Sequence, residues 1–171
     1  MANYYTEGSA VVPLTSKQCE TCLRIIEMIE DETINLVSKY INALTREKYN
    51  KDNILLARQW ARRNQDIYCC NSVGFDAEMT SDGLWVHNRD QLDIESLASF
   101  IQIVFRHYKL DDGFGFEVGH TCDRSRVDGF GGTAVFITKS NISWFSTYGW
   151  LDEKELRHAG RLNRKGMKKH G

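Results

Sequence analysis

The chain has 171 residues, of which 42% are hydrophobic and 26% charged, with 22 basic and 23 acidic side chains and a formal charge of −1. This is ordinary water-soluble composition, and one proline, no apolar run near the roughly 18 residues of a membrane span and no basic-then-apolar leader argue against collagen-like, membrane-spanning and secreted classes. We therefore expect one cytoplasmic domain whose five cysteines are thiols or metal ligands rather than a disulfide framework.

The amino-terminal lead-in precedes a helix start. Residues 1–14 mix polar and apolar side chains, which predicts an edge strand or a segment lying against the core. Thr15 and Gln18 then have the spacing of a capping box, in which a hydroxyl and an amide satisfy free backbone donors at the start of a helix.

Helical periodicity continues to about Asn64. Apolar residues at spacings of three and four predict a long helix to Leu44, with a bend or break near residues 31–33. A second helix is expected from about Asp52, so that the two form an antiparallel pair, or one helix with a shorter companion.

The hydrophobic period then changes to two, which is typical of strands. We expect strands over 67–71, 75–79 and 84–87, the last two forming a hairpin around Asp82-Gly83, because glycine accepts the positive φ of a tight turn.

The pattern of residues 93–145 predicts a helix followed by further strands. Asp93 is placed to cap a helix that runs to Tyr108 and has the clearest apolar stripe in the chain. Strands are expected over 113–120 and 133–138, and residues 142–145 form a third strand or a closing turn.

This element order predicts an α+β fold in which N-terminal helices pack on a mostly antiparallel sheet with β-β-α-β-β order. We expect one domain over residues 1–155, with a helical part over about 15–64 and a sheet-plus-helix part over about 66–152. Residues 156–171 form a basic C-terminal tail.

Charge is unevenly distributed along the chain. Residues 1–155 carry 16 basic and 23 acidic side chains, a balance of −7, whereas residues 156–171 carry six basic side chains and no acid, a balance of +6. Such a tail favours binding to nucleic acid by neutralising phosphates, although it has no aromatic residue for base stacking. The alternatives are a solvated terminus or a tail folded back on the acidic body. The basic residues are Arg157, Arg161, Arg164, Lys165, Lys168 and Lys169.

A glycine- and arginine-rich connection follows the strand at 113–120. Its glycines match neither the phosphate-binding loop nor the dinucleotide pattern, so the plainer interpretation is a long connection with Phe130 packed on the core. Arg124 and Arg126, with Asp128 beside them, are the best candidate for contact with an acidic partner group, because two guanidinium groups converge on one target.

The cysteines permit a zinc site or a reactive thiol. Cys19 and Cys22, together with His120 and Cys122, hold zinc if the first helix starts beside the strand end at 120–122, and otherwise the two helical thiols fill gaps in the core. His120 beside Cys122 also permits a nucleophilic thiol, but no catalytic spacing accompanies it. We therefore predict no catalytic residue and no cofactor, and zinc is the alternative.

Four aromatic residues gather near the end of the body. At this density rings more often close a core than form a partner-docking surface, and Trp85 in the hairpin is expected in the core as well. The four are Trp144, Phe145, Tyr148 and Trp150.

The segment from Phe130-Gly131-Gly132 to Thr138, with Trp144 and Trp150-Leu151, resembles small uncharacterised proteins encoded by phages, prophages and plasmids, over about residues 73–152. The resemblance implies an accessory product of a mobile element, for which inhibition of a host defence system by stoichiometric binding is a reasonable role.

The leading hypothesis is therefore a non-enzymatic protein that binds, and so inhibits, a host protein complex such as a CRISPR effector or nuclease. The alternatives are a nucleic-acid-binding protein that uses the basic tail and the arginine loop, and a zinc-containing or cysteine-dependent enzyme.

Overall fold

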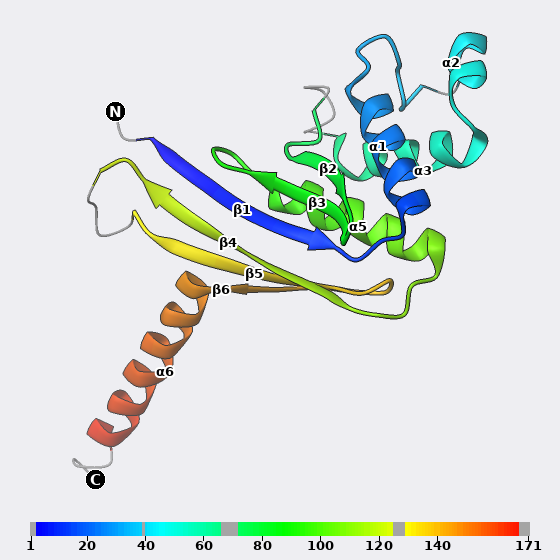
Figure 1. The fold of residues 1–171 in the computed structure, drawn as a ribbon. Coiled ribbons are helices and arrows are strands. Elements are labelled where there is room, and N and C mark those ends of the chain that lie inside the picture. The colour runs from blue at the N-terminus through cyan, green and yellow to red at the C-terminus, as the bar shows by residue number, and fades with distance from the viewer. Residues whose placement is uncertain (1–2, 39, 66–71, 125–128, 168–171) are drawn as a thin grey trace.

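The computed structural model describes residues 3–38, 40–65, 72–124 and 129–167, with side chains described to residue 158 (Figure 1). It confirms the α+β class, since helices accompany a six-stranded sheet in which every pair of neighbouring strands is antiparallel. None of the helices in these ranges has the length and apolarity needed to cross a membrane. The strand expected at 67–71 falls outside the described residues.

The sheet has the strand order β2-β3-β1-β4-β5-β6. Its two edges are therefore β2 and β6, which lie on opposite sides of four internal strands. The strands are β1 (Tyr4–Val12), β2 (Asp76–Thr80), β3 (Gly83–Asn88), β4 (Phe114–Cys122), β5 (Gly131–Ile137) and β6 (Ile142–Ser146).

The amino-terminal lead-in is an internal strand, so the expectation of an edge strand is wrong. Gly8 of β1 pairs with Asn88 of β3 on one side and with Val118 of β4 on the other. A Cβ at Gly8 would lie 2.7 Å from side-chain atoms of both Leu92 and Val118, so glycine permits the close approach. The chain thus brings its first strand between segments that lie about 80 and 110 residues later.

The predicted long helix breaks near residues 31–33, as expected. Helix α1 (Ser16–Glu30) begins with the predicted capping box, in which the Thr15 backbone N–H donates to Gln18 Oε1 at 2.8 Å. It ends at Asp31, whose Oδ1 accepts from the Thr33 backbone N–H at 3.0 Å, so a local turn replaces the next helical turn. The helices α2 (Ala43–Lys48) and α3 (Lys51–Arg63) follow.

The predicted hairpin and the central helix are confirmed. Strands β2 and β3 are joined at Gly83, which has φ +142°, and Thr80 pairs with it. Helix α5 (Ile94–Tyr108) begins at Asp93, whose Oδ1 accepts from the Ser96 backbone N–H at 2.8 Å.

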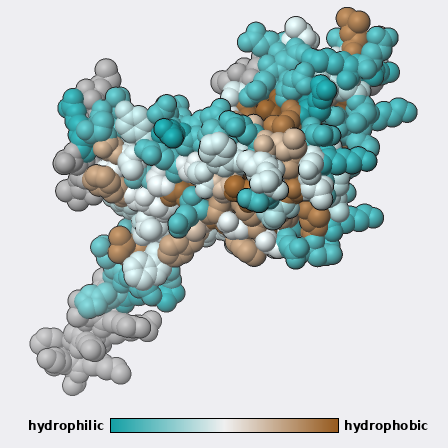
Figure 2. All heavy atoms as spheres, in the orientation of Figure 1, coloured by the Kyte–Doolittle hydropathy of each residue, from teal (hydrophilic) through white to brown (hydrophobic). Residues whose placement is uncertain are grey.

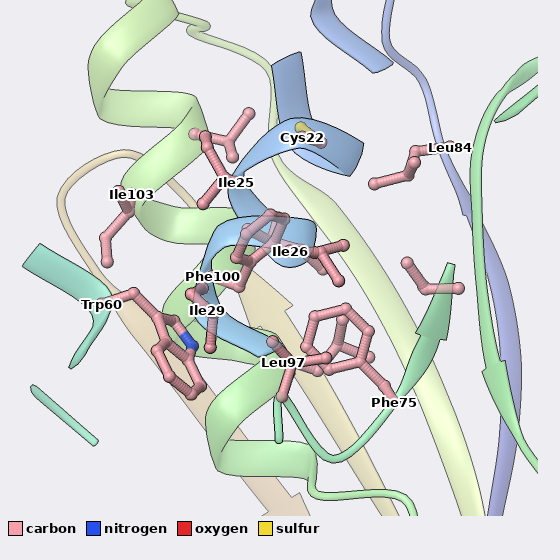
Figure 3. Packing of buried hydrophobic residues seen from close by; sticks show 14 of the residues in the cluster. Cys22, Ile25, Ile26, Ile29, Trp60, Phe75, Leu84, Leu97, Phe100 and Ile103 are labelled. Carbon is pink, nitrogen blue, oxygen red and sulfur yellow. The ribbon is translucent and has the colours of Figure 1, made fainter. Parts of the chain in front are cut away.

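The core lies between the sheet and the helices. Figure 3 shows Ile25, Ile26 and Ile29 of α1 among Trp60 of α3 and Phe100 of α5, and all five side chains are buried. Figure 1 shows α1, α3 and α5 grouped at one end of the sheet, so the other end carries no such helical cover.

The last helix was not predicted. Helix α6 (Thr147–Met167) follows β6 directly, includes part of the basic tail and projects away from the sheet (Figure 1). Near its start the Thr147 hydroxyl accepts from the Gly132 backbone N–H at 3.0 Å. The aromatic residues expected in the core are about half exposed instead: Trp144, Phe145, Tyr148 and Trp150. Phe130, which was expected to pack on the core, is 62% exposed.

Candidate functional site

The sheet has one covered face and one open face. Residues paired directly across antiparallel strands lie on the same face, and successive residues alternate between faces. The covered face carries Val12, Val86, Val118 and Val135, all buried. The open face is formed by the alternate residues, among them Glu7 and Val11 of β1, Glu78 of β2, Trp85 and His87 of β3, Glu117 of β4, Phe136 of β5 and Phe145 of β6.

The formally charged strand residues on the open face are all acidic. The six strands contain no lysine or arginine, and their four charged residues are all carboxylates. The strand register places each of the four on the open face: Glu7, Asp76, Glu78 and Glu117. This distribution makes the open face an acidic surface, in contrast to the basic tail.

A trough crosses the open face over β4, β5 and β6. It encloses about 550 Å³, and its floor is made of the small residues Gly115, Ala134 and Ser143. Glu117, Ala134 and Phe145 stand side by side in one row of the sheet, so the backbones of Glu117 and Phe145 lie about 10 Å apart across the alanine.

Two glycines leave room for Phe136, the aromatic residue at one side of the trough. Phe136 stands in the next row, between Gly115 and Ser143. A Cβ at Gly113 would collide with its ring, and a Cβ at Gly115 would lie 3.4 Å from Phe136 Cδ2. The Phe136 ring therefore lies close to Gly113 and Gly115, and the partly buried Ala134 also lines the trough.

A second aromatic group lies on the open face over β3. Trp85 stacks on His87 with 3.9 Å between ring centres, and its Nε1–H donates to Ser9 Oγ at 2.8 Å. Glu78 Oε1 lies 3.7 Å from His87 Nε2. The expectation that Trp85 belongs to the core is wrong, because its register places it opposite the helices.

Figure 2 shows near-neutral and hydrophobic residues over the strands, between hydrophilic surfaces at the helical end and on α6. The exposed apolar groups on the open face include Val11, Phe136 and Phe145. An acidic face with exposed rings combines the two contributions, apolar contact and charge, that protein interfaces use.

The predicted arginine loop and basic tail are described only in part. Arg124 is exposed and makes no ion pair within the described part of the chain, whereas Arg126 and Asp128 fall outside it. Arg161, Arg164 and Lys165 lie within α6, beyond the last described side chain. Lys168 and Lys169 lie outside the described residues, so the contact role of these residues stays a prediction.

The four candidate zinc ligands are not brought together. Cys19 and Cys22 are buried in α1, which follows the end of β1, whereas His120 and Cys122 of β4 pair with residues near the start of β1. The separation along β1 from Thr6 to Val12 is about 20 Å. No group of three or more His, Cys, Asp or Glu side chains able to hold a metal occurs among the described residues.

The two cysteine pairs have different surroundings. Burial raises the pKa of the Cys22 thiol, and Cys19 acts in the same direction, so these thiols pack in the core as neutral groups. His120 faces hydroxyls on both sides, Thr6 Oγ1 at 3.3 Å from Nδ1 and Thr133 Oγ1 at 2.8 Å from Nε2. The Cys122 Sγ lies 3.9 Å from Asp123 Oδ1.

Three residues of this site, Glu7, Glu117 and Phe136, were not among the predicted contact residues, and their period-two alternation was the available signal. Phe145 belongs to the aromatic group for which a docking surface was the alternative to a place in the core. A scan against protein-family models and searches of curated proteins and of solved structures found no match, so the chemistry of the open face carries the functional conclusion.

Proposed function

We propose that this protein acts by binding another protein through the open face of its sheet. The observation that carries the proposal is that one face of the sheet combines four carboxylates with an aromatic-walled trough. None of the six described strands contains a lysine or arginine. Burying exposed rings against a partner is favourable in proportion to the apolar area removed from water.

The partner that fits is a protein with a surface rich in lysine and arginine. Phe136 and Phe145 at the trough suit the aliphatic stems of such side chains and the flat guanidinium group, while Glu117 supplies the opposite charge. The same carboxylates repel phosphate backbones, which disfavours nucleic acid at this face.

The biological role that we propose starts from the expectation, drawn from residues 73–152, of a mobile-element accessory protein. We propose that the partner is part of a host defence complex, and that occupying its basic surface inhibits it. Many such surfaces in nucleases hold nucleic acid, so an acidic face of this kind competes for them.

Site-specific photo-crosslinking tests the proposal. A photoreactive phenylalanine analogue at Phe136 is compared with the same group at Leu44 on α2 and at Leu156 on α6, both of which are exposed apolar positions away from the open face. In lysate of the host, treated with nuclease, we expect one protein to crosslink from position 136 and to be identified by mass spectrometry, with the attachment site in a lysine- or arginine-rich segment. Crosslinking from position 156 alone, or only to nucleic acid before nuclease treatment, would contradict the proposal and favour the basic tail.

A further inference from the structure

The two edge strands of the sheet differ in their protection against pairing with another strand. An edge strand carries unpaired backbone N–H and C=O groups, and charged side chains or proline on that strand commonly discourage a further strand from adding to it. Strand β2 carries Asp76 and Glu78 among its five residues. Strand β6 has no charged residue and no proline, and residues 143–146 of it are exposed. The edge at β6 therefore lacks the protection that β2 has.

The hydrogen bonds of the β5–β6 hairpin show which backbone groups of β6 are free. The Thr138 backbone N–H donates to the Asn141 C=O at 2.8 Å, so these two residues form a hydrogen-bonded pair. Such pairs alternate along antiparallel strands, which directs the backbone groups of Ser143 toward β5. Ile142 and Trp144 therefore direct their N–H and C=O groups to the free edge, where no other described segment bonds them.

Helix α6 begins on the β5 side and leaves this edge open. Thr147 Oγ1 accepts from the Gly132 backbone N–H of β5 at 3.0 Å. Tyr148 lines a small cavity together with residues of β1, β4 and β5. The rest of α6 projects away from the end of β6 (Figure 1). The backbone of β6 is thus accessible to a further strand.

We propose that β6 pairs antiparallel with β6 of a second copy of this chain, which joins the two sheets around a two-fold axis. In this register the free backbone groups of Ile142 bond those of Trp144 in the second copy, and Ser143 lies opposite Ser143. The side chains of Ile142 and Trp144 then meet across the strands, and aromatic–β-branched pairs of this kind stabilise sheets. On the open face the two troughs adjoin at their Ser143 floors.

Charge favours a second copy at this edge. Because β6 has no charged residue, pairing it with itself opposes no like charges, whereas two β2 strands would bring together Asp76 and Glu78 of both copies. Helix α6 extends past β6 (Figure 1), and the chain carries +6 from residue 156 onward against −7 over residues 1–155. The pairing brings each basic tail to the acidic body of the other copy. It leaves the open face exposed and does not depend on the function proposed for it.

Sedimentation equilibrium of the purified full chain tests the pairing. We expect a dimer, and we expect Trp144→Lys to weaken it at least about tenfold, because the charge stands where the two strands join. Met79→Lys on β2 is the matched control, since Met79 is 47% exposed and Trp144 49%, and it is expected to leave the dimer within about twofold of wild type. A monomeric wild type, a dimer that Trp144→Lys leaves intact, or dissociation by Met79→Lys would overturn the proposal.

Cysteine crosslinking tests the register with conservative variants. The Ser143 residues of the two copies form a non-hydrogen-bonded pair with Cα atoms about 4.5 Å apart, a separation that a disulfide spans. With oxidised glutathione we expect Ser143→Cys to link two chains well above the level that the native cysteines give in wild type. Ser146→Cys is the control, because its counterpart lies about 20 Å away, and it is expected to stay at the wild-type level. Equal linking by both variants, or none by Ser143→Cys, would contradict the proposed pairing.

Discussion

The two faces of the sheet share strands but differ in what their side chains meet. Val12 of β1 is 0% exposed on the covered face, while its neighbour Val11 is 40% exposed on the open face. Phe100 of α5 is buried against the covered face, whereas Phe136 of β5 is 52% exposed on the open one. In these two pairs, the apolar residue on the covered face is buried and contributes to stability, whereas the one on the open face remains available for contact.

The largest expected effect is a difference in stability between a variant on the covered side and a variant on the open face. Phe100→Ala is expected to lower the free energy of unfolding by about 3–5 kcal/mol, because it removes buried area and leaves a cavity. Phe136→Ala is expected to cost less than about 1 kcal/mol, since its ring already meets solvent on one side. Urea denaturation of both variants measures the difference. Equal losses would mean that the open face is covered in solution.

The pH dependence of the free energy of unfolding tests whether water reaches the buried Cys22 thiol. Burial raises the pKa of Cys22, whereas an unfolded chain ionises this thiol near the ordinary value of about 8.5. The stability from keeping the thiol neutral is therefore fully present below pH 8.5 and is lost as the pH rises, by about 1.4 kcal/mol per pH unit.

At pH 10 the expected loss from this thiol is about 2 kcal/mol relative to pH 8.5. Denaturation of wild type, Cys22→Ala and Cys122→Ala at both pH values checks it, with Cys122 as the half-exposed control. The Cys22→Ala variant is expected to lose less stability than the other two proteins on raising the pH. Identical losses in all three would show that water reaches Cys22.

Local features of the fold could be predicted from the sequence. The hairpin at Gly83, the cap at Asp93 and the start of α1 at Thr15 each depend on residues within a few positions of one another. The placement of β1 could not be predicted in the same way. Its partners lie far along the chain, and its period-two pattern fits an edge strand as well as an internal one.

The site depended on information that local patterns lack. Alternation separates Glu117 and Phe136 from their buried neighbours, but it does not say which face the helices cover. The aromatic residues after β5 were expected in the core because rings usually are buried. Here β6 is an edge strand and α6 projects from it (Figure 1), and Trp144 and Trp150 are about half exposed.

The affinity of full-length variants for the partner identified by crosslinking tests the central claim most directly. The open-face variant is Glu117→Lys, and the matched tail variant is Arg157→Gln, which changes one exposed charge on α6. By calorimetry we expect Glu117→Lys to weaken binding at least about tenfold, and wild-type binding to weaken as salt screens the charges. Arg157→Gln is expected to leave the affinity within about twofold of wild type. Unchanged affinity for Glu117→Lys in a folded protein, with loss for Arg157→Gln, would contradict the account.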